Sequence, residues 1–125
     1  MGRVRGDRIN PYNVSFTKSL TVGEYSTPHF RFELRLGHGS RSWWLWLRVT
    51  VIKGSNYLMS QGVELQTPYG TVQGLPHGTG LNWTVGSQRC SDAIAIGYGP
   101  WPVKVTFKSS GSGGPQSKTV TVNQP

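Results

Sequence analysis

The residues that could carry out acid–base or metal chemistry are few and dispersed in this 125-residue chain. The acids are distant from one another in sequence: Asp7, Glu24, Glu33, Glu64 and Asp92. A paired-carboxylate site needs two carboxyl groups about 5 to 9.5 Å apart, and no local pair supplies one. His29, His38 and His77 have no acidic neighbours at metal-ligand spacing. We therefore expect no enzyme activity, no cofactor and no metal site.

The remaining reactive groups also give no indication of a catalytic site. Cys90 is the only cysteine, which excludes an internal disulfide and a cysteine-based metal site. Arg89 beside it would favour a thiolate, but a small structural cysteine is the commoner case. The segments GLPHGTG and GYGPWP are rich in glycine, yet neither has the Lys-Ser/Thr ending of a phosphate-binding loop. The sequence therefore favours binding or assembly over catalysis.

Aromatic side chains are the stronger candidates for function. The segment 42–52 alternates, so that Trp43 falls in phase with the aliphatic residues, while Trp44 and Trp46 face the opposite way. Two exposed indoles on one sheet face would form a platform for sugar rings, bases or apolar side chains. The alternative is a central strand covered on both faces, which would make every Trp a core residue.

A ligand or partner platform would combine these indoles with one arginine and with a later aromatic segment: Trp44, Trp46, Arg48, Tyr98 and Trp101. Because only Arg48 brings charge to it, we expect a protein or sugar partner rather than nucleic acid.

The N-terminus carries the one cluster of basic residues. The chain has 13 Lys and Arg against five Asp and Glu, a net charge of +8 and a pI near 10.2, and this charge attracts anions. We predict a basic extended arm over residues 1–12, followed by a domain over 13–125. The expected assembly residues are Arg3, Arg5, Arg8, Val14 and Phe16. Such an arm docks either on its own domain or on a neighbour. Docking on a neighbour would make the protein an assembly subunit, so we expect a homo-oligomer. Nucleic acid is a second, weaker candidate partner.

Alternation with a period of two recurs along the chain, as in HFRFELRL, and it predicts half-buried strands. We expect strands near 14–22, 29–36, 42–52, 62–66, 81–85, 93–96, 103–108 and 118–122. Seven or eight strands at this spacing predict an all-β fold, a single antiparallel β-sandwich of immunoglobulin-like or jelly-roll-like type.

Residues 30–125 resemble the C-terminal, immunoglobulin-like carbohydrate-binding domain of expansins and grass-pollen group-2 allergens. The matching segments are FRFEL, SWWLWLRV, GVEL, LNWTV, PWPVKVTF and KTVTVNQP. The resemblance implies cellulose binding through aromatic residues in line on one sheet, with Trp44 and Trp46 as the candidates. The region 86–99 is longer than that family's pattern, and the first 27 residues have no counterpart in it.

Two function classes follow from these features. The first is a non-catalytic structural subunit of a virion or an extracellular filament that assembles through the arm. The second is an extracellular carbohydrate-binding module. Asn13 and Asn82 match the N-glycosylation pattern. The chain has no apolar run long enough to span a membrane. Its first residues lack the apolar segment of a secretory signal, so either the protein stays where it is made or a signal has been removed.

Overall fold

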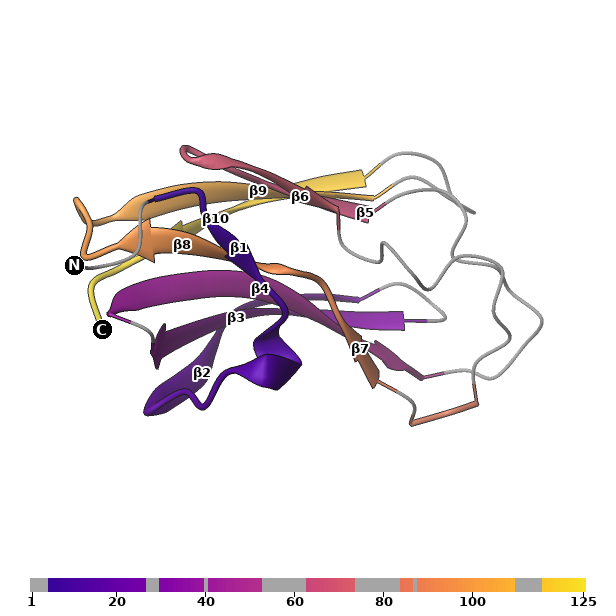
Figure 1. Cartoon of the computed structure of the whole chain (residues 1–125). Helices are drawn as coiled ribbons and strands as arrows, with labels where there is room; N and C mark the ends of the chain where they lie inside the picture. Colours follow the sequence, from indigo (N-terminus) through magenta and orange to yellow (C-terminus); the bar gives the residue numbers. More distant parts are fainter. Residues whose placement is uncertain are drawn as a thin grey trace.

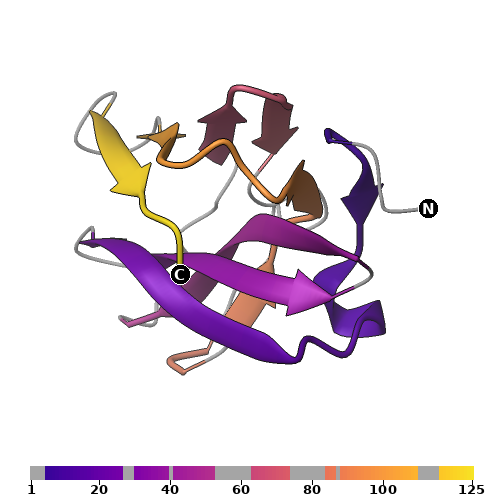
Figure 2. The ribbon, with the colours of Figure 1, turned by 90° about the vertical axis from the view of Figure 1, so that its left-hand side faces the viewer.

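The computed structural model describes residues 5–26, 30–39, 41–52, 63–73, 84–86, 88–109 and 116–125. In these residues the chain forms two antiparallel sheets that pack face to face (Figure 1). The predicted all-β sandwich is confirmed. Seen from the left-hand side of Figure 1, the two sheets form separate layers (Figure 2).

The described residues contain ten strands and one short 3-10 helix. In chain order they are β1 (Arg8–Ile9), η1 (Pro11–Asn13), β2 (Lys18–Ser26), β3 (Phe30–Gly39), β4 (Ser42–Val51), β5 (Val63–Thr67), β6 (Gly70–Gln73), β7 (Gln88–Cys90), β8 (Ala93–Gly97), β9 (Val103–Ser109) and β10 (Gln116–Val122). Sheet A has the order β1-β8-β4-β3-β2, with β7 also paired to β4, and sheet B has the order β10-β9-β5-β6.

The main core lies between the two sheets and follows from the alternation of β3 and β4. Phe30, Phe32, Leu34 and Leu36 of β3 point into it. The aliphatic residues of β4 also point into this core: Leu45, Leu47, Val49 and Val51. Sheet B contributes the apolar side chains that face them: Leu65, Val72, Val103, Val105, Phe107 and Val122. Because successive side chains of a strand point to opposite faces, this core leaves the other face of β4 to be covered separately.

Several strand boundaries differ from the predicted ones. β2 begins at Lys18 rather than near Val14, because residues 14–17 lie against sheet A without pairing as a strand. β6 (Gly70–Gln73) and β7 (Gln88–Cys90) lie outside all of the predicted strand ranges. The predicted strand 81–85 lies mostly outside the described residues. The described part thus has more strands than the seven or eight expected, since two- to four-residue strands leave no periodic signal.

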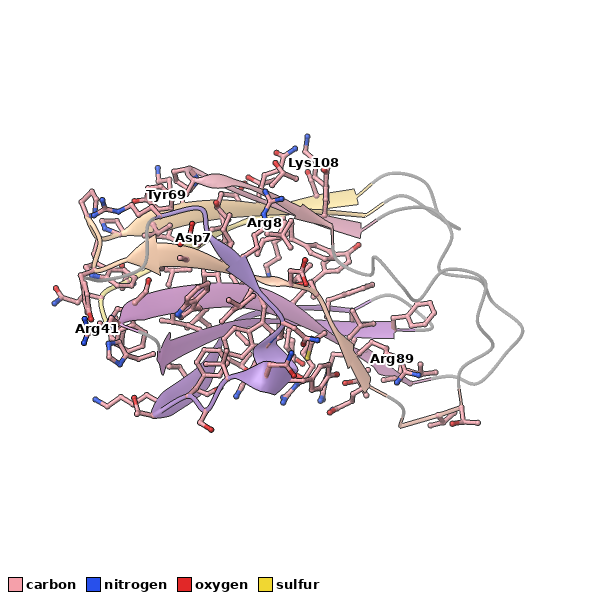
Figure 3. The ribbon with its side chains drawn as sticks, in the orientation of Figure 1. Asp7, Arg8, Arg41, Tyr69, Arg89 and Lys108 are labelled. Atoms are coloured by element: carbon pink, nitrogen blue, oxygen red, sulfur yellow. The ribbon has the colours of Figure 1, made fainter. Side chains whose placement is uncertain are left out.

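The N-terminal segment, residues 5–17, docks on its own domain. Arg8 and Ile9 pair with Ile94 and Ala93 of β8, and on the N-terminal side Gly6 N donates to the Ala95 carbonyl at 2.8 Å. Asp7 and Arg8 therefore lie along the body of the sandwich (Figure 3). Assembly through this segment stays a prediction.

Candidate binding site

Trp44 and Trp46 do not form an exposed platform. They are 0% and 5% exposed, so the prediction of a surface indole pair is wrong, and the alternative of a strand covered on both faces holds for these two residues, whereas Trp43 and Trp101 are half-buried. Their predicted orientation is correct, since both indoles belong to a second apolar cluster separate from the core between the sheets.

The N-terminal segment covers these indoles. The ring of Phe16 stacks on that of Trp46, with centroids 4.6 Å apart and an interplanar angle of 18°. Trp44 Nε1 donates to the Gly39 carbonyl at 2.7 Å, so its polar atom is satisfied inside the cluster. Small and aliphatic side chains complete it: Ile9, Ala93 and Ala95. We call Phe16, Trp44 and Trp46 the covered cluster.

Gly37 on β3 makes room for this stacking. A Cβ at Gly37 would lie 2.7 Å from Cη2 of Trp46 and 2.9 Å from Cδ1 of Phe16, closer than carbon atoms can approach. The glycine at this position is the sequence signal that the face is covered, because an exposed sheet face has no need of such space.

Arg48 follows Trp46 on the same outer face of β4 and belongs to a polar network there. Its guanidinium donates to both carboxylate oxygens of Glu33 at 3.0 Å. Burial alone would raise the pKa of Glu33, but hydrogen bonds from Thr21 and Arg48 and the charges of Arg48 and Arg31 outweigh it and lower that pKa. The positive charge of Arg48 is therefore balanced by Glu33 within the fold, and its guanidinium is not directed at a ligand beside Trp46.

Tyr98 and Trp101 meet two other aromatic residues at the end of the sandwich. His38 of β3 and Trp43 of β4 face each other across the strand pair, and their rings lie 4.9 Å apart. The ring of Tyr98 is 5.8 Å from that of His38, and Trp101 meets Trp43 edge-on at 6.2 Å. Tyr98 is 60% exposed, and the other three are half-buried. We call His38, Trp43, Tyr98 and Trp101 the aromatic cap.

The loop that carries Tyr98 and Trp101 is held by the N-terminal segment. Gly99 has φ of +116°, and a Cβ there would lie 2.9 Å from Cδ1 of Trp101, so this close approach requires glycine. Its carbonyl accepts from Arg5 Nε at 2.9 Å and from the Tyr69 hydroxyl at 3.5 Å. The guanidinium of Arg5 also lies over the Tyr69 ring, 5.6 Å from its centroid. Tyr69 is labelled near this end of the molecule in Figure 3.

The other residues predicted to form the assembly arm do not share one site. Arg8 Nη2 donates to the Thr71 carbonyl at 2.7 Å, and Arg3 lies outside the described residues. Val14 is half-buried and lies close to Gly39. Two of the three clustered arginines, Arg5 and Arg8, thus bind carbonyl groups of their own chain.

The short helix η1 lies against β7. Tyr12 is largely exposed, but the partial burial of its hydroxyl and a hydrogen bond with Cys90 raise the pKa of Tyr12 to about 12. Asn13 is exposed on this helix, so its accessibility is compatible with glycosylation, which stays a prediction. Asn82 lies outside the described residues.

The aromatic cap offers ring faces together with imidazole and indole nitrogens. Within the described part of the chain, no three His, Cys, Asp or Glu side chains gather where they could hold a metal ion. The sequence prediction found Tyr98 and Trp101 but missed His38 and Trp43. The signal was available, since a tight β3–β4 hairpin places these two residues opposite each other.

Comparison with known proteins gives no relative from which a role could be transferred: no family model, curated protein or solved structure matches this chain significantly. No helix of the described segments is long and apolar enough to cross a membrane.

Proposed function

We propose that this domain is a non-catalytic binding module that receives the flat face of a sugar ring on its aromatic cap. The observation that carries the proposal is the convergence of four rings from β3, β4 and the loop after β8 at one end, with Tyr98 60% exposed.

The chemistry of the cap supports a sugar as ligand. Apolar C–H groups on one face of a pyranose ring pack against aromatic faces, and the hydroxyl groups around the ring need hydrogen-bond partners. The indole N–H of a Trp donates, and an imidazole both donates and accepts. A rigid sheet end with a few such groups positions a ligand without rearrangement.

Charge favours a neutral ligand over nucleic acid at this site. Of the clustered N-terminal arginines, Arg5 and Arg8 donate to main-chain carbonyls. The guanidinium of Arg5 is thus used to hold the Tyr98 loop in place and is not directed at a phosphate.

The test is a pull-down by insoluble polysaccharides, with cellulose, chitin and xylan as probes. We expect Tyr98→Ala to lose retention on the polysaccharide that binds the wild-type chain. Tyr12→Ala is the matched control, because Tyr12 is 65% exposed and lies on η1, outside the cap. Equal retention of both variants, or no retention of the wild type on any probe, would contradict the proposal.

A second candidate is a self-assembling structural subunit, and one observation favours it. The segment that closes the covered cluster is separable, since its strand β1 has only two residues. If neighbouring copies exchange this segment, the same contacts form between chains. Light scattering of the full chain distinguishes the two candidates: a mass larger than a dimer supports assembly, and a small species at every concentration argues against it.

A further inference from the structure

Five strands lie at the edges of the two sheets in the described part of the chain, and four of them are protected; one of these four, β7, has only three residues. β1 has two residues and is followed closely by Pro11, β6 has four residues, and β2 is interrupted by a register shift between Thr21 and Gly23. Short strands and bulges are the usual means by which proteins prevent edge-to-edge pairing.

β10 is neither short nor interrupted. It pairs with β9 at every position from Gln116 to Val122, seven residues without a shift, and its flanking prolines, Pro115 and Pro125, lie outside the strand. Because β10 is the outer strand of sheet B, its other side presents a regular row of main-chain donors and acceptors with which no strand in the described part of the chain pairs. A long, regular edge of this kind is a template for another strand.

The side chains of β10 do not oppose such pairing. Ser117, Thr119 and Thr121 are exposed on its outer face. Lys118 is the only charged residue of the strand, and its Nζ donates to the Glu24 carbonyl of β2 at 2.6 Å. That lysine is therefore directed at the chain's own sheet A.

We propose that a second copy of this chain pairs antiparallel with β10 about a two-fold axis at Thr119, joining the two B sheets into one. In this register Ser117 faces Thr121 of the other copy, and Lys118 faces Val120, so no like charges meet. A two-fold contact must be self-complementary in this way, which favours a second copy over an unrelated strand.

A threonine ladder supports the same register. The hydroxyls of Thr106 and Thr119 lie 3.2 Å apart across the β9–β10 pair. In the proposed dimer Thr119 faces Thr119 of the other copy, so the ladder continues through the axis to the second Thr106. Cross-strand threonine pairs of this kind stabilise sheets. The inference depends neither on the aromatic cap nor on exchange of the N-terminal segment.

The first experiment is a charge test on the full chain by sedimentation velocity over a wide concentration range. Ser117→Lys with Thr121→Lys places two facing lysine pairs across the axis, and we expect the dimer dissociation constant to rise about tenfold or more. Ser117→Glu with Thr121→Lys places opposite charges there and should restore or tighten the dimer. Both pairs replace exposed side chains, so circular dichroism should be unchanged.

The matched control adds the same two charges elsewhere, as Ser15→Lys with Ser26→Lys, at exposed positions outside β10; it should leave the dissociation constant unchanged. A wild-type chain that stays monomeric at all concentrations overturns the proposal. So does a dimer that is insensitive to the paired lysines, or one that the control weakens equally.

The second experiment tests the register by disulfide formation in a Cys90→Ser background. Facing residues of an antiparallel pair have Cα atoms about 4.5 or 5.5 Å apart, within the range of a disulfide, so Thr119→Cys should give a covalent dimer. Ser117→Cys should not, because its symmetry mate would be about 13 Å away along the strand. Linkage through position 117 and not 119 would overturn the two-fold at Thr119.

Discussion

Two groups of aromatic residues include tryptophans of β4, and only one of these groups is covered by another segment. Trp43 and Trp44 are consecutive, yet Trp44 is fully buried in the covered cluster, while Trp43 lies in the aromatic cap beside the exposed Tyr98. The two groups do not differ in residue type. They differ in what covers them, because Phe16 lies over one group, and Tyr98 of the other stays 60% exposed.

Because of this difference, we expect mutations in the two groups to have different effects. Removing a ring from the covered cluster leaves a cavity and should cost stability. Removing the exposed ring of the cap leaves no cavity, so it should cost binding and little else.

The largest expected effect is that of Trp44→Ala. The indole is 0% exposed and its Nε1 is hydrogen-bonded to Gly39, so we expect a loss of about 3 to 5 kcal/mol in unfolding free energy. Tyr98→Ala is the comparison and should change it by no more than about 0.5 kcal/mol. Urea denaturation followed by circular dichroism measures both. Similar losses for the two variants would mean that the cap is as much a core as the covered cluster.

A smaller effect is expected for Gly37→Ala. The added Cβ would clash with Trp46 and Phe16 and should displace the N-terminal segment. We expect the unfolding free energy to fall by about 1 to 3 kcal/mol. Gly39→Ala is the control, since its Cβ would meet Phe16 at 3.2 Å and should cost less. Denaturation curves give the costs, and Trp fluorescence reports exposure of the indole. An equal cost at both positions would argue against tight stacking over Gly37.

The smallest effect concerns the polar part of the same sheet face, where Glu33 binds Arg48. Glu33→Gln should lower the unfolding free energy by about 1 kcal/mol at pH 7. The pKa of Glu33 is lowered in the folded state, so its contribution is present above the ordinary value near 4.5 and is lost as the pH falls.

The difference between wild type and Glu33→Gln should therefore shrink between pH 6 and pH 3, measured by thermal unfolding at each pH. A difference that stays constant over this range would show that the carboxylate charge does not stabilise the fold.

Much of the fold could be predicted from the sequence, because strands with one face in the core alternate visibly. Phe30 to Leu36 and Trp43 to Val51 are of this kind, and both lie in the main core as expected. The short strands β1, β6 and β7 could not be predicted, since two to four residues carry no period.

The candidate site was predicted less well, for a physical reason. Alternation gives the face on which Trp44 and Trp46 lie, but it does not say whether another segment covers that face. The cover comes from Phe16, almost thirty residues earlier, and only the space left by Gly37 hints at it. Trp43 was missed for the converse reason, because it reads as core although it lies at the open end of the sandwich. His38 was missed because the predicted strand ended at residue 36, whereas β3 continues to Gly39.

The central claim is that the aromatic cap, and not the covered cluster, is the binding surface. The most direct test is a ¹H–¹⁵N spectrum of the indole N–H groups during titration with a soluble oligosaccharide, cellohexaose first and then oligomers of any polysaccharide that retains the protein. The account predicts that the signals of Trp43 and Trp101 shift with the ligand while those of Trp44 and Trp46 stay in place. Shifts confined to Trp44 and Trp46, or no shift with any oligosaccharide, would contradict it.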